Sequence, residues 1–454
     1  MAEAGRERIE AMGREGISRL LLRFSAPAII ANEASASYEL FDAIWCGRLA
    51  TEALAALTVA GPLMAIYRAI GSGIAVGSAS LIARSLGAGR KDEANRAACN
   101  SIFLFFMVSG IGAFLCLLGL ELFLHLFGAS ESVMPFAYSY MFIETLGMPI
   151  DFFLIVAAEL VRVQGSPTIA GIGLLVANVA DMIWSPILIF GLGPFPALGI
   201  AGAALGTLIG RSLGVALLIL YLGFRSIYRF RLSYFIPDYR IIANIYSIGA
   251  SSSLRAGAVS ISQMLSCRVA SSFGTIPLAV LGTLFRVNRI NFAFSIGISQ
   301  GVLPLVGYNF GSQKNDRVRK IVVKAGLVSL SWGALWCAAA MLFPGQILSL
   351  FSQDPDFIRE GIRGLQIFSI AFLMVPEVII SSFFQGIGKA IPSLIVSSSR
   401  QILFLIPCLL ILPYVFGIEG LWSSYPAAGA MALTLGGVLT IFQFRKLNSD
   451  QIAT

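Results

Sequence analysis

Long apolar segments, separated by short polar ones, run along almost the whole chain of 454 residues. Twelve of these segments meet or approach the roughly 20 residues that a helix needs to cross about 30 Å of hydrocarbon. The pattern therefore predicts an all-α integral membrane protein with twelve transmembrane helices. A transmembrane β-barrel would need short segments of alternating polarity, and the sequence contains none. The predicted spans are Leu20–Trp45, Leu54–Ile82, Ile102–Phe127, Phe142–Val161, Ile169–Phe190, Ile200–Leu222, Ile245–Ala270, Leu278–Val306, Ile321–Leu350, Ile367–Phe384, Leu394–Val415 and Leu421–Phe442.

The two halves of the chain carry the same pattern. Ala53–Asp92 aligns with Pro277–Asp316 at an offset of 224 residues, and 11 of the 40 positions are identical. Because each half has an even number of spans, both halves have the same orientation, as in transporters whose substrate site lies between two repeats. The sequence thus predicts two parallel six-helix repeats around a central cavity. These are an N-lobe at 19–223 and a C-lobe at 242–444, with a cytosolic linker at 224–241 and cytosolic tails at 1–18 and 445–454.

Composition supports the membrane assignment. Hydrophobic residues make up 57% of the chain, charged residues 12%, and the mean hydropathy is +0.83; a soluble chain would carry about twice that charged fraction. Lys and Arg concentrate in alternate connections, whereas the connections at 128–133, 191–199 and 416–420 contain neither. The positive-inside rule therefore places both termini in the cytosol. The net charge of +8 reflects this bias, so we expect a lipid bilayer and no nucleic acid as partner.

Several enzyme classes lack their chemistry here. The chain has a single histidine, His125, and its six cysteines are scattered without a CxxC pair. The chain therefore lacks the ligands for a typical zinc site and offers only one histidine for a catalytic triad. It also has no GxxxxGK[ST] loop for ATP. We expect a protein that is not an enzyme and has no cofactor, driven by an ion gradient or by the gradient of its substrate.

Carboxylates in the first half are candidates for the coupling site, because an acid within a membrane span is costly unless it functions or is paired. Asp42 shares a helix face with Tyr38 and Glu39 in the first span. At an offset of 224 its counterpart is Ser266, so this acid belongs to one half only. The alternative is that Asp42 lies at the outer membrane interface, since the span ends near residue 47.

The fifth span carries a second acid, Asp181, flanked by Asn178 and Ser185 about one turn away on either side and followed by Pro186. Asp42 and Asp181 can meet inside the first half. Two carboxylates suit a proton, because their repulsion favours protonation of one, and they suit Na⁺, which prefers oxygen ligands.

Deep basic residues distinguish the second half. Arg255 lies in the seventh span, Arg286 in the eighth and Glu377 in the tenth. The arginines either pair with Glu377 or backbone carbonyls, or line the substrate cavity together with Gln263. In the second case they favour an anionic or zwitterionic substrate.

Five sequence signatures resemble those of the multidrug and toxic compound extrusion (MATE) transporters of prokaryotic type. They occur in the family's order and spacing over essentially the whole chain: FDAIWCGRLATEALAA at 41–56, LIARSLGAG at 81–89, ILIFGLG at 187–193, GAALGT at 202–207 and PLVGYNFG at 304–311. The resemblance implies two six-helix lobes and alternating access in the inner (cytoplasmic) membrane. It also implies export of an organic cation or amphipathic drug, by a monomer, in exchange for H⁺ or Na⁺.

The resemblance also assigns residues. Asp42 matches the family's acid in the first span, Thr207 matches a hydroxyl of the cation site, and Pro27 matches the proline at which the first helix bends. A Na⁺ ion would then bind at Asp42, Asp181 and Thr207. The chain departs from the family in the fifth span, where the acid usually stands directly before the proline; Asp181 lies one turn earlier. Flipping of a lipid-linked sugar and export of an organic anion remain the alternative functions.

Overall fold

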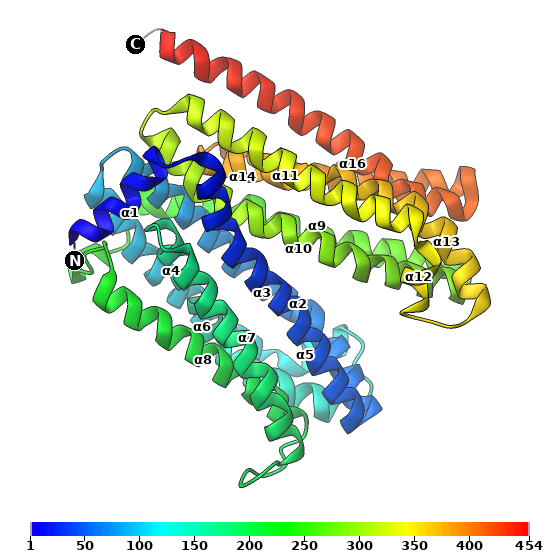
Figure 1. Cartoon of the computed structure of the whole chain (residues 1–454). Coiled ribbons are helices and arrows are strands. Elements are labelled where there is room, and N and C mark those ends of the chain that lie inside the picture. Colours follow the sequence, from blue (N-terminus) through cyan, green and yellow to red (C-terminus); the bar gives the residue numbers. More distant parts are fainter. Residues whose placement is uncertain (1, 453–454) are drawn as a thin grey trace.

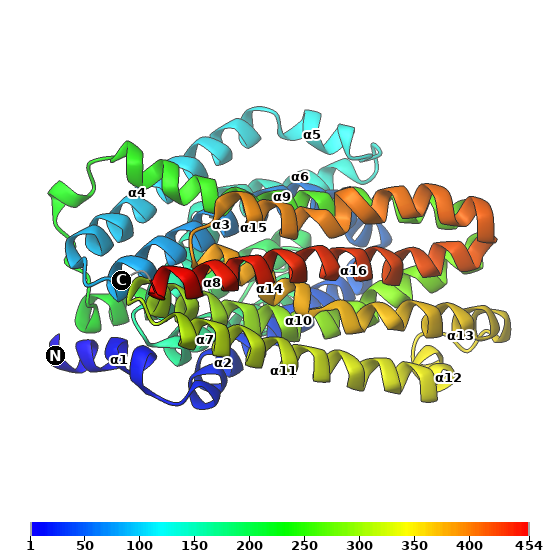
Figure 2. The ribbon, with the colours of Figure 1, turned by 90° about the horizontal axis from the view of Figure 1, so that it is seen from above.

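The computed structural model describes the backbone of residues 2–452, and the side chains of residues 7–38, 41–50 and 52–447. Residues 2–452 contain helices and no strand. Figure 1 shows two bundles of long helices that lie together at the end of the molecule holding both termini and diverge towards the other end. In the perpendicular view the two termini again lie at the same end (Figure 2).

The first bundle is built by the first half of the chain. Its long helices are α2 (Ile17–Leu49), α3 (Thr51–Gly87), α4 (Lys91–Leu118), α6 (Met134–Val163), α7 (Pro167–Phe190) and α8 (Ile200–Arg225). Helix α1 (Ala2–Arg14) precedes them and the short α5 (Leu120–Leu126) follows α4. Residues 226–238, which include the 3₁₀ turn η1 (Leu232–Tyr234), lead to the second bundle.

The second bundle repeats this order with two interrupted spans. It contains α9 (Tyr239–Ser272), α10 (Thr275–Gly311), α11 (Asn315–Leu342), the short α12 (Pro344–Ser349), α13 (Pro355–Ser369), η2 (Ile370–Met374), α14 (Pro376–Gly386), α15 (Ala390–Ser398), η3 (Ser399–Leu405) and α16 (Ile406–Ile452). Pro376 starts α14 after the 3₁₀ segment η2, because proline cannot donate to the preceding turn. Segment η3 is a π-helix in which the backbone widens between α15 and α16.

The prediction of twelve transmembrane helices is confirmed. Within the described residues, nine helices are long and apolar enough to cross a membrane. One of them, Ala390–Leu447, spans 58 residues and turns back at Gly417, whose φ of 60° favours glycine, so it crosses twice. Helices α2 and α9 supply the remaining two crossings with 33 and 34 residues. Each lobe therefore contributes six helices.

Duplicated glycines close the lobes against each other at the end that holds the termini. A Cβ on Gly77 of α3 would lie 2.0 Å from the carbonyl oxygen of Ile245 on α9. A Cβ on its repeat mate Gly301 of α10 would lie 2.6 Å from Ser25 Oγ on α2. Small residues permit such close approach of helices in membranes. Each lobe thus packs its second long helix on the first helix of the other lobe.

These contacts also correct the alignment of α2 with α9, the first helices of the two lobes. Gly77 and Gly301 are 224 residues apart, whereas their partners Ser25 and Ile245 are 220 apart. Helix α9 is therefore shifted by one turn relative to the glycine-based alignment. The structural counterpart of Asp42 is Ser262, one turn before the Ser266 expected from the sequence offset.

Candidate functional site

A stripe of glycines on α8 brings α7 into backbone contact. A Cβ on Gly206 would lie 2.6 Å from Ser185 Oγ, and one on Gly210 would lie 2.8 Å from the backbone nitrogen of Asp181. Gly202 and Gly214 continue the same spacing of four residues along the helix. This spacing puts all four glycines on one face of α8. The glycine stripe is visible in the sequence, and it indicates that α8 packs closely on the face of α7 that carries Asp181 and Ser185.

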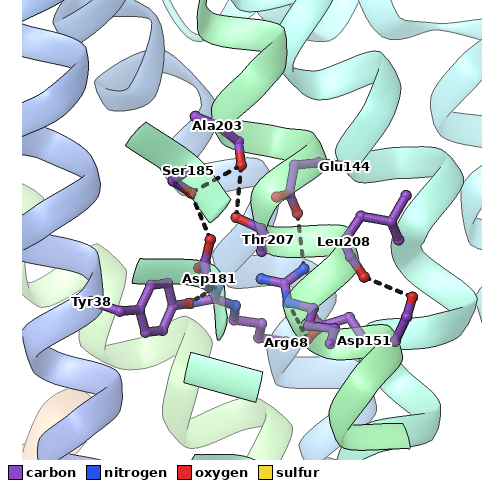
Figure 3. A network of polar contacts seen from close by, with 11 residues as sticks. Tyr38, Arg68, Glu144, Asp151, Asp181, Ser185, Ala203, Thr207 and Leu208 are labelled. Carbon is purple, nitrogen blue, oxygen red and sulfur yellow. Dashed lines mark hydrogen bonds and ion pairs between the residues drawn. The ribbon is translucent and has the colours of Figure 1, made fainter. Parts of the chain in front are cut away.

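The carboxylates at this contact are buried. Asp181 is 3% exposed and Asp42 is 7% exposed. Ser185 Oγ donates to Asp181 Oδ1 at 2.7 Å, and Thr207 Oγ1 donates to the carbonyl oxygen of Ala203 at 3.1 Å (Figure 3). Asp42 interacts with the Ser185 hydroxyl and lies within Coulomb range of Asp181. The structure thus brings Asp42, Asp181 and Ser185 together, and Thr207 on the neighbouring helix α8 contacts Asp181.

A buried ion cluster that sequence reasoning missed lies beside these acids. Arg211, one turn after Thr207, places Nη1 3.0 Å from Glu144 Oε2 and Nε 3.1 Å from Asp151 Oδ1 (Figure 3). All three residues are at most 9% exposed. Glu144 and Asp151 lie two turns apart on α6, and this spacing places them on one helix face. The spacing of the two acids, together with the position of Arg211 one turn after Thr207, was the signal in the sequence that pointed to this ion cluster.

Arg68, which is hydrogen-bonded to Tyr38, adds another positive charge to the same region. The Tyr38 hydroxyl accepts a hydrogen bond from Arg68 Nη2 at 2.9 Å (Figure 3). A cavity of about 460 Å³ in the N-lobe is lined by Tyr38, Asp42, Arg68, Thr207 and Arg211, among others. We call it the N-lobe cavity. It exposes the acid of α2 to a space that a cation and water can occupy.

The other residues predicted for the coupling site have different surroundings. Asn178 donates to Ser35 Oγ at 2.8 Å, so it ties α7 to α2. Pro27 packs against Gly171 of α7, where an added Cβ would lie 2.6 Å from the proline Cβ, and α2 continues through it as one helix. Glu39 lies on α2, but its side chain is outside the part of the chain that the structure describes.

A second cavity lies between α2 and the C-lobe. This central cavity has a volume of about 490 Å³, and Gln263 and Arg286 line it as the sequence predicted. Arg255 does not; it lines a separate pocket of about 190 Å³ with Glu159 and Gln385. Glu377 lines neither pocket, because it lies behind Arg400 with its Oε2 3.8 Å from Arg400 Nη1. Sequence reasoning missed Arg400, which itself lines the central cavity.

Helix α2 separates the two cavities. Asn32 and Ser35 face the central cavity, whereas Tyr38 and Asp42, one to two turns further along, face the N-lobe cavity. The two cavities therefore share one helix.

Comparisons with known proteins agree with this architecture. The model of the MatE family matches residues 27–187 and 254–410, once in each lobe and over more than half of the chain. The chain belongs to the MATE family. Since MATE proteins are transporters, the chain is a multi-pass membrane transporter and not an enzyme.

Among curated MATE relatives, the chain is 27% identical to "Multidrug export protein MepA" of Staphylococcus haemolyticus over 90% of both proteins. It is 24% identical to "FAD transporter" of Shewanella oneidensis over 90% of this chain and 91% of that protein. Among solved structures, a MATE protein in the bent conformation superimposes with a TM-score of 0.91 at 23% identity, covering 99% of both chains. One in the straight conformation gives 0.91 at 24% identity, covering 97% of this chain and 98% of that one. These structural matches show the two-lobe MATE fold.

Proposed function

We propose that this chain exports small amphipathic compounds in exchange for a cation, H⁺ or Na⁺, that binds at Asp42 and Asp181. The observation that carries the proposal is the position of Asp42. It is a buried carboxylate next to a second one, on a helix that also lines the central cavity. The MepA relatives, which are named multidrug export proteins, support the substrate class.

The charge balance of the N-lobe favours cation binding at these two acids. Arg211 already compensates Glu144 and Asp151 through direct ion pairs. Asp42 and Asp181 have no direct basic partner of that kind among the described residues; Asp42 contacts the Ser185 hydroxyl, and Asp181 contacts the hydroxyls of Ser185 and Thr207. Two buried carboxylates close together bind a proton readily, and with the hydroxyls of Ser185 and Thr207 they form an oxygen-rich site that also suits Na⁺.

Coupling then requires that the cation bind the two states of the transporter unequally. A cation at Asp42 removes the repulsion between two carboxylates on α2 and α7. Helix α2 responds near Pro27, which has no backbone N–H and so leaves a gap in the helical hydrogen bonds. Because Ser35 on the same helix faces the central cavity, substrate affinity changes with occupancy of the acid.

The membrane arrangement belongs to the same proposal. We place the protein in the inner membrane of the producing cell, with both termini in the cytosol. The reason is that the Lys- and Arg-rich connections lie on the same side of the membrane as the termini. The lobes comprise residues 19–223 and 242–444, joined by the linker at 224–241, and a monomer contains both cavities. In this orientation the contacts at Gly77 and Gly301 close the cytosolic side, which corresponds to the state that releases substrate outward.

The test uses the full chain in proteoliposomes loaded with a fluorescent dye, under an imposed pH gradient or an imposed Na⁺ gradient. We expect wild-type efflux to follow one gradient and to be lost in Asp42→Asn. Asp356→Asn, which changes an exposed acid at the start of α13, serves as the matched control and keeps wild-type flux. Gradient-driven efflux that persists in Asp42→Asn would refute coupling at this residue.

A further inference from the structure

An apolar groove with a volume of about 720 Å³ lies between α2 of the N-lobe and helices α10 and α11 of the C-lobe. Leu22, Ile30 and Leu327 line it and are 70%, 57% and 58% exposed. In a transmembrane bundle such exposed apolar side chains contact the hydrocarbon of the bilayer. We call it the α2–α11 groove. It shares no lining residue with the central cavity or the N-lobe cavity, so it is a separate site that opens to the lipid.

The charged end of this groove lies towards the termini, where α2 begins. Lys324 lines the groove there, and its Nζ donates to Ser18 Oγ at 3.0 Å. Glu15, the acid that precedes α2, pairs instead with Arg23 at 3.5 Å. Arg19, directly after Ser18, is exposed. An ammonium group has three N–H donors, so Lys324 can donate to further acceptor oxygens at the mouth of the groove.

The length of the groove matches one leaflet of a bilayer. Along α2 its lining runs from Ser18 to Ile30, which is about 18 Å of helix at 1.5 Å per residue. One leaflet contributes about 15 Å, half of the roughly 30 Å of hydrocarbon in a bilayer. An acyl chain that lies along the groove therefore brings its headgroup to the level of Lys324.

The internal repeat provides a comparison for this polar end. At the offset of 224 residues Lys324 of α11 corresponds to Asn100 of α4, and at the offset of 220 Ser18 corresponds to Asp238, which precedes α9. The inter-lobe linker satisfies Asn100, whose Nδ2 donates to the carbonyl oxygen of Tyr234 at 3.0 Å and whose Oδ1 accepts from the Asp238 backbone N–H at 2.9 Å. Lys324 makes no such contact with the backbone before α2 in the described part of the chain. The position that the linker fills on one side is thus left to an external group on the other.

From this geometry we infer that the α2–α11 groove binds an anionic phospholipid. One acyl chain lies along the groove, and the headgroup phosphate accepts hydrogen bonds from Lys324. Arg19 adds a second positive charge near the start of α2. Because a Lys or Arg near the membrane surface favours anionic lipid by about fivefold, these charges select an anionic headgroup over a zwitterionic one. The inference does not depend on the proposed function.

A lipid in this groove also favours one arrangement of the lobes. Ile29 of α2 lines the groove and packs on Gly297 of α10, where an added Cβ would lie 2.5 Å from Ile29 Cγ1. Because α2 supplies one wall and α10 and α11 supply the other, separation of α2 from the C-lobe removes the site. A ligand that binds only one of two states increases the population of that state. The lipid therefore stabilises the contact between the lobes at the end that holds the termini.

Trp332 of α11 allows a direct test, because its ring stacks on the groove residue Phe294 with the ring centroids 4.2 Å apart. The full-length protein is reconstituted into equimolar vesicles of phosphatidylglycerol and phosphatidylcholine. One of the two lipids carries a brominated acyl chain, which quenches tryptophan fluorescence on contact, and the difference from Trp332→Phe isolates the quenching at Trp332. We expect occupancy by the brominated phosphatidylglycerol to exceed that by the brominated phosphatidylcholine roughly fivefold or more.

Variants of the groove separate the headgroup from the acyl chain. Lys324→Gln should lower the preference for phosphatidylglycerol about fivefold, and Lys324→Arg should retain it. Lys91→Gln removes an exposed lysine at the start of α4 that does not line the groove, and should keep the wild-type preference. Ala26→Tyr introduces into the groove the residue that the repeat carries at the equivalent position, Tyr246. This variant should reduce the quenching of Trp332 by both lipids.

Three results would overturn the inference. Equal quenching of Trp332 by the two brominated lipids in the wild type would mean that ordinary boundary lipid passes over the groove. A preference that persists in Lys324→Gln would place the headgroup elsewhere. No quenching by either lipid would mean that something other than lipid, such as a second copy of the chain, covers the groove. Since binding is measured without any ion gradient, a protein that shows the Lys324-dependent preference but no coupled export would keep this site and lose the proposed function.

Discussion

Gly73 on α3 and Gly249 on α9 pack backbone against backbone across the two lobes. A Cβ on Gly249 would lie 2.2 Å from the carbonyl oxygen of Gly73, and a Cβ on Gly73 would lie 3.0 Å from that of Gly249. Neither backbone atom can move away without shifting a transmembrane helix. The closed end of the molecule therefore depends on the absence of side chains at these two positions.

Gly249→Ala should weaken this closure. The added methyl group forces α3 and α9 apart, at a cost of roughly 1–3 kcal/mol for the closed state. Hydrogen–deuterium exchange of the full-length protein should accelerate in the α3 segment at residues 70–87. Gly257→Ala, on the same helix with nothing within 4 Å of its Cβ, should exchange like the wild type. Equal exchange in the two variants would show that the glycine contact does not limit closure.

The sequence predicted the fold to the level of lobes and repeats but not the contact between them. Span length and the duplicated glycines at 73, 77 and 87 indicated two six-helix halves, and the structure confirms them. The partners of those glycines were not predictable, because an alignment of the halves does not tell which helix of the other lobe lies opposite. The shift of α9 by one turn, which replaces Ser266 by Ser262 as the counterpart of Asp42, follows from the same limitation.

The candidate site was predictable where its residues share one helix face. Tyr38 and Asp42 follow helical spacing on α2 and line the same cavity. Arg211 was missed because its partners come from α6, and a pairing between helices has no local pattern. Arg255 was placed in the central cavity from its depth in the span, but depth does not fix the direction in which a side chain points around the helix axis.

Arg211 should be essential for stability of the N-lobe. Arg211→Met leaves Glu144 and Asp151 as buried acids without their direct partner, and breaking a buried ion pair in this way costs about 3–5 kcal/mol. We expect a large decrease in the temperature of thermal unfolding in detergent.

Neutral partners should compensate for that loss. Glu144→Gln and Asp151→Asn, added to Arg211→Met, remove both uncompensated charges and should recover most of the unfolding temperature. If the triple variant is as unstable as Arg211→Met, the ion pairs are not the source of the stabilisation.

Arg317 connects the N-terminal segment to the C-lobe. Its Nη2 donates to the carbonyl oxygens of Met12 at 3.3 Å and Glu15 at 2.6 Å, while Arg8 on the same helix α1 donates to Ser166 Oγ of the N-lobe at 2.9 Å. Helix α1 thus spans both lobes at the end that holds the termini. Arg317→Ala should release it and lower stability by roughly 1–3 kcal/mol.

Limited proteolysis of the N-terminal segment measures this release. Cleavage before residue 20 should become faster in Arg317→Ala and stay at the wild-type rate in Arg319→Ala, which removes an exposed arginine of α11 two residues away. Equal cleavage of both variants would show that Arg317 does not hold α1.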